Sequence, residues 1–249
     1  MNTSKENYGQ DAPGVVRGLA LAGVVLLFAA RSSGRGGLWL TNLSGPIEAL
    51  RPTAIATGLG LVLMALWMMI SSRWLKQIVL RQLLDSRQWR GDERVLDVGC
   101  GRGLVAIGAA RRVPNGRVTA IDLWAARDLS GNDADHARAN AEAAGVADRL
   151  EIDTGDMRTL PYTDGAFDVV ASMTAIHNIE EEAGRIAAVA EIWRVTKPGG
   201  QILIYDIRHA RAYARQFRTL GATDIRMSWP ILLWGVLGWR FSATRPSLG

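Results

Sequence analysis

The chain has 249 residues, of which 48% are hydrophobic and 21% charged, so it is long and apolar enough to bury a core and is not a disordered or collagen-like sequence. Its one cysteine, Cys100, excludes an internal disulfide framework and a metal site built from several cysteines. The net charge of +5 does not indicate nucleic-acid binding. Residues 1–91 hold ten Lys or Arg against four Asp or Glu, whereas the rest of the chain is nearly neutral.

Two apolar segments come first in the chain. Thr53–Ser72 has 20 residues and no charge, which is the length that an α-helix needs to cross about 30 Å of hydrocarbon at about 1.5 Å per residue. Gly18–Ala30 is shorter and reaches that length when the preceding residues join the helix, with Arg17 extending its charge toward the headgroups. We predict a membrane anchor over residues 1–74, with transmembrane helices at about 12–30 and 53–72.

The first apolar segment has a second interpretation as the core of a signal peptide, with Ala29 and Ala30 near a cleavage point. Both interpretations leave the residues after Ser72 on the cytoplasmic side. Basic residues are denser after the second segment than between the two, which agrees with that orientation. We therefore predict a multi-pass membrane protein with a cytoplasmic main domain, joined to the anchor by an amphipathic connector over residues 75–91.

From Arg94 onward, apolar strand-like runs alternate with helical patterns, which is typical of βαβ units and a parallel sheet. The predicted strands are Arg94–Val98, Arg117–Asp122, Leu150–Asp153, Phe167–Ser172 and Gln201–Asp206. The predicted helices are Leu104–Arg112, Asp133–Ala144 and Glu182–Arg194. We assign residues 92–249 to this α/β domain.

The most informative segment is the run from Val95 to Leu104, in which a buried strand leads through a glycine-rich turn into a helix. Such a turn brings backbone N–H groups close to a ligand, although some tight turns use glycine without binding anything. The spacing G-x-G-x-G differs from the dinucleotide pattern G-x-G-x-x-G. Asp97 lies two positions before the first glycine, where its carboxylate would attract a cationic ligand and repel a pyrophosphate. Asp122 ends the second strand, where its oxygens can accept both hydroxyls of a ribose.

A series of short motifs resembles, in order and spacing, that of the class I S-adenosylmethionine-dependent methyltransferases. The series consists of Asp97–Gly103, Asp122, Gly155–Met157, Leu160–Tyr162, Phe167–Val170 and Lys197–Gly200. The resemblance covers about Arg90–Arg245 and leaves the two apolar segments outside. It implies a Rossmann-like seven-stranded sheet closed by an antiparallel hairpin of Asp224–Ser228 and Trp239–Arg245, with S-adenosyl-L-methionine as the cofactor.

The resemblance also implies roles for the matching residues. The turn would hold the amino-acid part of the cofactor through Gly99, Cys100, Gly101 and Gly103. Asp97 would lie near the cofactor's ammonium group, and Asp122 would bind the ribose. The residues implied around the adenine and the methyl group are Leu123, Asp156 and Met157, and then Ser172 and Met173.

Methyl transfer from a sulfonium has a neutral leaving group, so in-line positioning and exclusion of water supply most of the catalysis. His177 follows the fourth strand and is the candidate general base, because an unperturbed histidine pKa of about 6.5 suits proton removal. The alternative is that His177 is an ordinary polar residue at the start of a helix. The histidines show no metal-ligand spacing, so we predict no metal.

No Asp-Pro-Pro-Tyr-like segment follows the fourth strand, where Ala171–Thr174 stands instead, so the sequence favours a small-molecule acceptor over nucleic acid. The apolar stretch Trp229–Trp239 has three interpretations: it enters the bilayer, it covers the active site, or it packs on the domain as an ordinary loop. We expect methyl transfer to a small, lipophilic acceptor at the cytoplasmic membrane face. The alternatives are a nicotinamide-dependent oxidoreductase and a membrane module that binds the cofactor without turnover.

Overall fold

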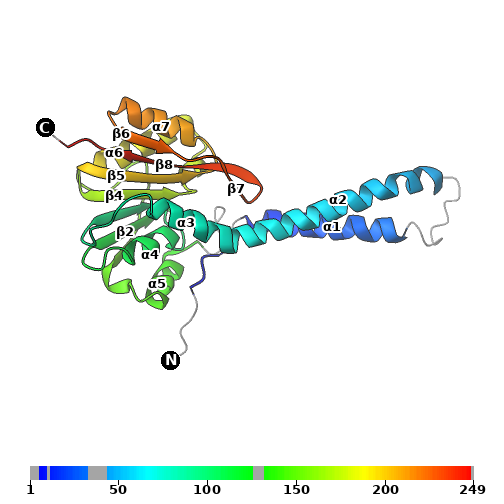
Figure 1. The fold of residues 1–249 in the computed structure, drawn as a ribbon. Coiled ribbons are helices and arrows are strands. Elements are labelled where there is room, and N and C mark those ends of the chain that lie inside the picture. The colour runs from blue at the N-terminus through cyan, green and yellow to red at the C-terminus, as the bar shows by residue number, and fades with distance from the viewer. Residues whose placement is uncertain (1–5, 10–11, 33–43, 126–131, 248–249) are drawn as a thin grey trace.

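The computed structural model describes residues 6–9, 12–32, 44–125 and 132–247, which form a pair of long helices beside an α/β domain (Figure 1). Helices α1 (Pro13–Ser32) and α2 (Ser44–Ile70) run side by side away from the domain. They approach most closely where glycines face each other: a Cβ on Gly23 would lie 2.8 Å from the carbonyl oxygen of Gly58. Small residues at such a crossing let two helix backbones pack together.

Both helices are long and apolar enough to cross a membrane by length and composition, and the second apolar range extends over Ala49–Leu84. Many of their large apolar side chains are exposed, among them Leu21, Phe28, Leu63 and Leu66. A core helix of a soluble domain would bury such side chains. The exposure is what the predicted anchor requires, and the anchor itself stays a prediction.

The second helix continues beyond the predicted span. A π-helical turn, η1 (Ser71–Leu75), leads directly into α3 (Lys76–Leu84), so the segment predicted as a connector begins as part of the same long helix. The apolar face of α3 is buried in the core of the α/β domain through Val79, Leu80, Leu83 and Leu84. By its packing, α3 belongs to the domain as much as to the anchor.

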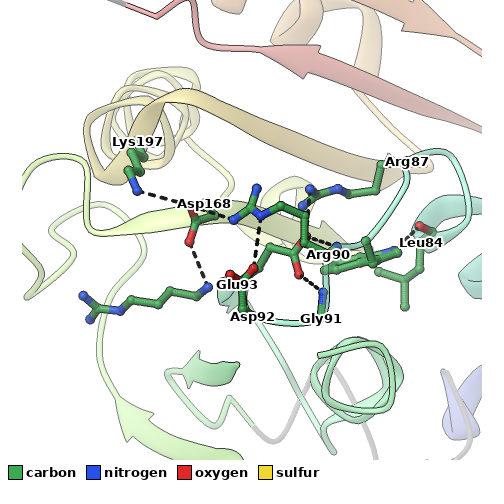
Figure 2. A network of polar contacts seen from close by, with 10 residues as sticks. Leu84, Arg87, Arg90, Gly91, Asp92, Glu93, Asp168 and Lys197 are labelled. Atoms are coloured by element: carbon green, nitrogen blue, oxygen red, sulfur yellow. Dashed lines mark hydrogen bonds and ion pairs between the residues drawn. The ribbon is translucent and has the colours of Figure 1, made fainter. Parts of the chain in front are cut away.

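A polar network holds the turn that follows α3 (Figure 2). Glu93 is fully buried, and its carboxylate accepts hydrogen bonds from the backbone N–H groups of Arg90 and Gly91 at 2.7 and 2.9 Å. The Arg87 guanidinium adds a third bond at 3.1 Å. Three donors satisfy the buried carboxylate group, so this turn has one strongly favoured geometry.

The same network reaches the sheet through Asp168 (Figure 2). Its carboxylate accepts from the backbone N–H of Arg94 at 3.0 Å and lies 3.4 Å from the ammonium group of Lys197. Asp168 lies near the start of its own strand and therefore links it to the starts of the strands on either side.

The domain is built on an eight-stranded sheet of order β3-β2-β1-β4-β5-β8-β6, in which β7 pairs with β8. The first five strands are parallel, and β8 and β6 add an antiparallel pair beyond β5. The strands are β1 (Arg94–Val98), β2 (Arg117–Asp122), β3 (Leu150–Thr154), β4 (Phe167–Met173), β5 (Thr196–Asp206), β6 (Thr223–Met227), β7 (Ile231–Leu233) and β8 (Val236–Thr244). The predicted fold class is confirmed, while the sequence analysis did not predict β7.

Helices cover both faces of the sheet, because successive strand residues point to opposite sides. Val95 and Val169 pack with α3 and α4 (Leu104–Ala110), whereas Leu96 and Val170 pack in a second core with α6 (Glu182–Val195) and α7 (Ala210–Thr219). The remaining helices are α5 (Ala134–Ala143) and the short turns η2 (Ala147–Arg149) and η3 (Ile176–Asn178).

Candidate active site

A cavity of about 410 Å³ opens beyond the carboxyl ends of β1, β2 and β4, the edge at which open α/β sheets bind ligands. Eight of the residues predicted to contact the cofactor line it: Gly99, Cys100, Gly101, Asp122, Leu123, Asp156, Met157 and Met173. The motif series, which is spread over much of the chain, therefore converges on one space.

The glycine turn after β1 has a backbone that other residues rarely adopt. Gly99, Gly101 and Gly103 have φ angles of 74°, 52° and 81°. A Cβ on Gly99 would lie 2.2 Å from the Cβ of Ala175 on the opposite wall, so only glycine fits there. Gly103 is the N-cap residue of α4 and does not line the cavity.

Asp122 connects the glycine turn to the loop after β2. Its Oδ2 accepts a hydrogen bond from the backbone N–H of Gly101 at 2.8 Å, and its Oδ1 accepts from that of Trp124 at 2.7 Å. Trp124 has a φ of 60°, so this bond helps to hold a strained backbone beside the cavity. The carboxylate thus shapes the cavity and also lines it, as binding of a ribose would require.

Asp97 lies beneath the glycine turn and is fully buried. Its Oδ2 accepts from the backbone N–H of Ala106 at 2.9 Å, but its Oδ1 is buried and has no hydrogen-bond partner among the described residues. Burial raises the pKa of this carboxyl group to about 8. A buried acceptor without a donor is unfavourable, and an ammonium group held by the turn would satisfy it. The unpaired Oδ1 beneath the glycine turn therefore fits the ammonium group in the amino-acid part of S-adenosylmethionine.

Asp156 lines the cavity, and its carboxylate is held by Arg158 in the following turn. The Arg158 Nη2 lies 2.6 Å from Oδ2, and the Arg158 backbone N–H donates to Oδ1 at 2.8 Å. The side-chain hydrogen bond from Arg158 lowers the pKa of Asp156. A ligand amino group that binds Asp156 would therefore have to share it with Arg158.

Ser172 and Met173, both predicted to border the methyl group, have different positions. The Ser172 hydroxyl is buried and donates to the carbonyl oxygen of Val98 at 2.8 Å, so it joins β4 to β1 and does not line the cavity. Met173 lines the cavity. Thr174 follows with a φ of 56°, fixed by its N–H bond to the carbonyl oxygen of Tyr205 at 2.8 Å.

His177 lies in η3 and is not one of the residues that line the cavity, although its neighbour Asn178 is. The ring Nδ1 lies 2.5 Å from Oδ1 of Asp206, a buried carboxylate at the end of β5. The backbone N–H of His177 donates to the other carboxylate oxygen at 3.2 Å. The short contact between Nδ1 and Oδ1 does not have the geometry of a hydrogen bond, so Asp206 lies beside the ring without fixing its orientation. The role of His177 as a base stays a prediction.

The cavity shows no sign of thiolate chemistry, because burial raises the pKa of the Cys100 thiol well above its ordinary value. Within the described ranges, no three His, Cys, Asp or Glu side chains are grouped to hold a metal ion. The expected absence of a metal stays a prediction.

Two cavity residues come from the part of the chain that precedes β1. Tyr8, which precedes α1, and Lys76, the first residue of α3, both line the cavity. The segment of Tyr8 is held in place by Asn140, whose Oδ1 accepts from the backbone N–H of Asn7 at 2.7 Å and whose Nδ2 donates to the Asn7 carbonyl oxygen at 2.9 Å. Sequence reasoning missed both residues, because neither lies near a recognisable motif.

Residues 95–200 match a family model described as a methyltransferase domain. A ubiquinone/menaquinone biosynthesis C-methyltransferase from Roseobacter denitrificans is 32% identical over 124 residues, which are 50% of this chain and 46% of that protein. The chain thus spans about half the length of the curated relatives it matches.

Solved structures with this fold include proteins of different chemistry. A [4+2]-cyclase has a TM-score of 0.58 at 19% identity, over 69% of this chain and 82% of that one. A geranyl diphosphate C-methyltransferase from Streptomyces coelicolor, solved with S-adenosyl-L-homocysteine, has a TM-score of 0.55 at 17% identity, over 72% of this chain and 82% of that one. At these identities, the likeness establishes the fold alone.

Proposed function

We propose that the domain containing residues 95–200 is a class I S-adenosylmethionine-dependent methyltransferase domain, and that it transfers the methyl group of S-adenosylmethionine to a small, lipophilic acceptor at the cytoplasmic face of a membrane. In this function, the cofactor binds at the edge of the sheet and the acceptor comes from the lipid bilayer. The two long helices anchor the chain, with the α/β domain on the cytoplasmic side.

The observation that carries the proposal is the shared lining of the cavity. Asp122 and Asp156 contribute from the α/β domain, and Lys76 contributes from the helix that continues the second apolar segment. Lys76 stands four residues after Ser72, the last residue of the uncharged stretch. At about 1.5 Å per helical residue, the distance along the helix is about 6 Å. A cavity so near the proposed bilayer surface suits an acceptor that partitions into lipid.

The names of the relatives support the same class of acceptor. Several of them are ubiquinone/menaquinone biosynthesis C-methyltransferases, and quinones with isoprenoid tails dissolve in bilayers. We therefore propose a ring carbon of a quinone-type lipid as the methylated atom.

When it is bound, S-adenosylmethionine supplies a methyl group on a sulfonium, which leaves as a neutral thioether. The residues of this chain would bind the cofactor and orient it toward the acceptor. Asp97 answers the ammonium group, Asp122 accepts from the ribose hydroxyls, and the apolar walls exclude water. Met173 borders the space between cofactor and acceptor. His177, which lies beside Asp206, is the candidate to take the proton that the acceptor loses.

A second candidate function is cofactor binding without methyl transfer. The observation that favours it is the [4+2]-cyclase with the same fold, because one fold can carry unrelated reactions. The nicotinamide alternative is weaker, since the glycine spacing differs from the dinucleotide pattern.

One experiment separates these functions. The full-length protein in lipid nanodiscs is incubated with S-adenosylmethionine that carries a radiolabelled methyl group, and with a membrane lipid extract. We expect label in the lipid fraction, and loss of both cofactor binding and label transfer in Gly101→Val and Asp122→Ala. The matched control is Asp135→Ala, which removes an exposed carboxylate on α5.

Binding without labelled lipid would instead support the non-catalytic module. Unchanged cofactor affinity in both Gly101→Val and Asp122→Ala would show that the site assignment is wrong.

A further inference from the structure

The hairpin formed by β7 and the first residues of β8 is the part of the domain that extends toward the long helices (Figure 1). Its turn is formed by Trp234 and Gly235, which have φ angles of 52° and 83°. Paired residues are Leu233 with Val236, Leu232 with Leu237 and Ile231 with Gly238. We call this segment, Ile231–Gly238, the apolar hairpin.

The apolar hairpin is docked against α2 and η1. The Trp234 indole N–H donates to the Ser72 hydroxyl at 2.9 Å, and the ring packs beside a cluster of Val16, Ala65 and Met68. A Cβ on Gly235 would lie 3.0 Å from the sulfur of Met64. Met64 stands eight residues before Ser72, which is about 12 Å along the helix at about 1.5 Å per residue. The turn therefore lies beside the uncharged stretch, well before its end.

One face of the apolar hairpin is fixed to the protein. Leu233 is fully buried, and a Cβ on Gly238 would lie 2.5 Å from the hydroxyl oxygen of Tyr205, so the backbone sits directly on β5. The other face is bare. The directly paired Leu232 and Leu237 are 47% and 48% exposed. Directly opposite residues of an antiparallel pair share a face, so they form one apolar surface.

We propose that this bare face of the apolar hairpin inserts into the interfacial layer of the bilayer and is a third membrane-contacting element of the protein. The inference rests on the anchor in the proposed function. At the level of the turn, α2 itself exposes Leu63 and Leu66, and both face lipid in that proposal. A second copy of the chain is the other occupant that such a surface could take.

The chemistry of the apolar hairpin sets its depth. A two-stranded ribbon has backbone groups on its outer edges, and the hydrocarbon core offers these groups no partners. The boundary between headgroups and acyl chains does offer them, and it is also where tryptophan is favoured. Trp229, just before the hairpin, is 90% exposed. Because the Lys76 ammonium lies 5.7 Å from the centre of the Trp234 ring, insertion would hold this wall of the cavity at the membrane surface.

The test uses the full-length chain in vesicles of phosphatidylcholine and phosphatidylglycerol. Leu232→Cys and Leu237→Cys are each labelled with an environment-sensitive nitrobenzoxadiazole dye, and the buried Cys100 of the unsubstituted chain gives the labelling background. Leu63→Cys on α2 reports the bilayer. Ile186→Cys on α6, an apolar position that is 50% exposed, is the matched control outside the membrane.

The turn lies about 12 Å along α2 before Ser72. We therefore expect the dyes at 232 and 237 to be quenched by lipids that carry a nitroxide near the headgroup or on the upper part of the acyl chain, and the dye at 186 to be unaffected. Dyes at 232 and 237 that behave like the dye at 186, while the dye at 63 is quenched, would overturn the proposal. If the dyes at 232 and 237 are instead shielded from water only at high protein concentration and are not quenched by nitroxide lipids, a second copy of the chain covers this face and the proposal is wrong.

A dye at 63 that no lipid quenches would overturn the anchor, and the hairpin proposal with it. Label transfer to lipid extract is measured on the same preparations, so failure of the methyltransferase function is seen separately from failure of insertion. Leu232→Ser with Leu237→Ser provides a second measurement: we expect loss of vesicle-dependent activity while cofactor binding is retained.

Discussion

Asp97 and Asp122 show how two carboxylates of one site do different work. Asp122 is tied by backbone N–H groups on both sides and shapes the rim of the cavity. Asp97 is buried beneath the turn with one oxygen unpartnered among the described residues. The first accepts hydrogen bonds at the rim, while burial raises the pKa of the second to about 8.

Asp97 predicts a pH dependence of stability in the ligand-free protein. The folded protein holds a proton on Asp97 up to a pKa of about 8, whereas an unfolded chain releases it near the ordinary aspartate pKa of 3.8. Stability therefore falls as the pH rises between these values, by at most about 1.4 kcal/mol per pH unit. Asp97→Asn has no proton to release, so the fall in melting temperature should become shallower. If the melting temperatures of the two proteins fall equally with rising pH across this range, the assignment of the raised pKa to Asp97 is wrong.

The N-terminal segment Glu6–Gly9 is an element that sequence patterns do not reveal. Asn140 holds its backbone from both sides, and Arg102 donates to the Asn7 carbonyl oxygen at 3.2 Å. Tyr8 thereby becomes part of the cavity wall. The segment precedes α1 and the domain follows α2, so the helix pair returns the chain to the side from which it started (Figure 1).

Asn140→Ala should release this segment. Two neutral hydrogen bonds of about 1 kcal/mol each are lost, which corresponds to an opening equilibrium raised about thirtyfold, at about 1.4 kcal/mol per factor of ten. Hydrogen exchange of the Asn7 amide should accelerate accordingly, and cofactor affinity should fall because Tyr8 leaves the wall. Gln216→Ala, which removes a side-chain amide on α7, is the control. An unchanged exchange rate at Asn7 would show that Asn140 does not hold the segment.

At the scale of the whole molecule, anchor and domain share structure at α3. This helix continues α2, buries its apolar face in the domain core and contributes Lys76 to the cavity. A boundary at residue 92 follows the motif series, but it separates the sheet from a helix that covers one of its faces.

Truncations test this continuity. A chain that starts at residue 71 keeps α3, so we expect it to fold, with reduced cofactor affinity because Tyr8 is missing. A chain that starts at residue 91 exposes the core beneath Leu83 and Leu84, so it should aggregate or lose several kcal/mol of stability. Size-exclusion chromatography and thermal melting compare the two. Equal solubility and equal melting temperatures would contradict the role of α3.

The sequence by itself determined the α/β class and the parallel strands, because these depend on local patterns such as strand periodicity and a glycine turn. The resemblance to a known family supplied the closing pair of β6 and β8 and most of the predicted cofactor contacts. The positions of Asp97 and Ser172 beneath the cavity, and not in its wall, needed the packed structure. A strand pattern shows which residues end near a site, but it does not show which side chains reach it.

Only the tertiary structure decided how the N-terminal segment and the long helix contribute to the cavity. Tyr8 and Lys76, far apart in sequence, meet in the cavity wall because Asn140 holds the segment of Tyr8 and α2 continues into α3. Trp234 lies beside Lys76 because the apolar hairpin docks on η1. Such contacts come from the packing of whole elements across long stretches of chain, and hydrophobic periodicity carries no information about partners at that distance.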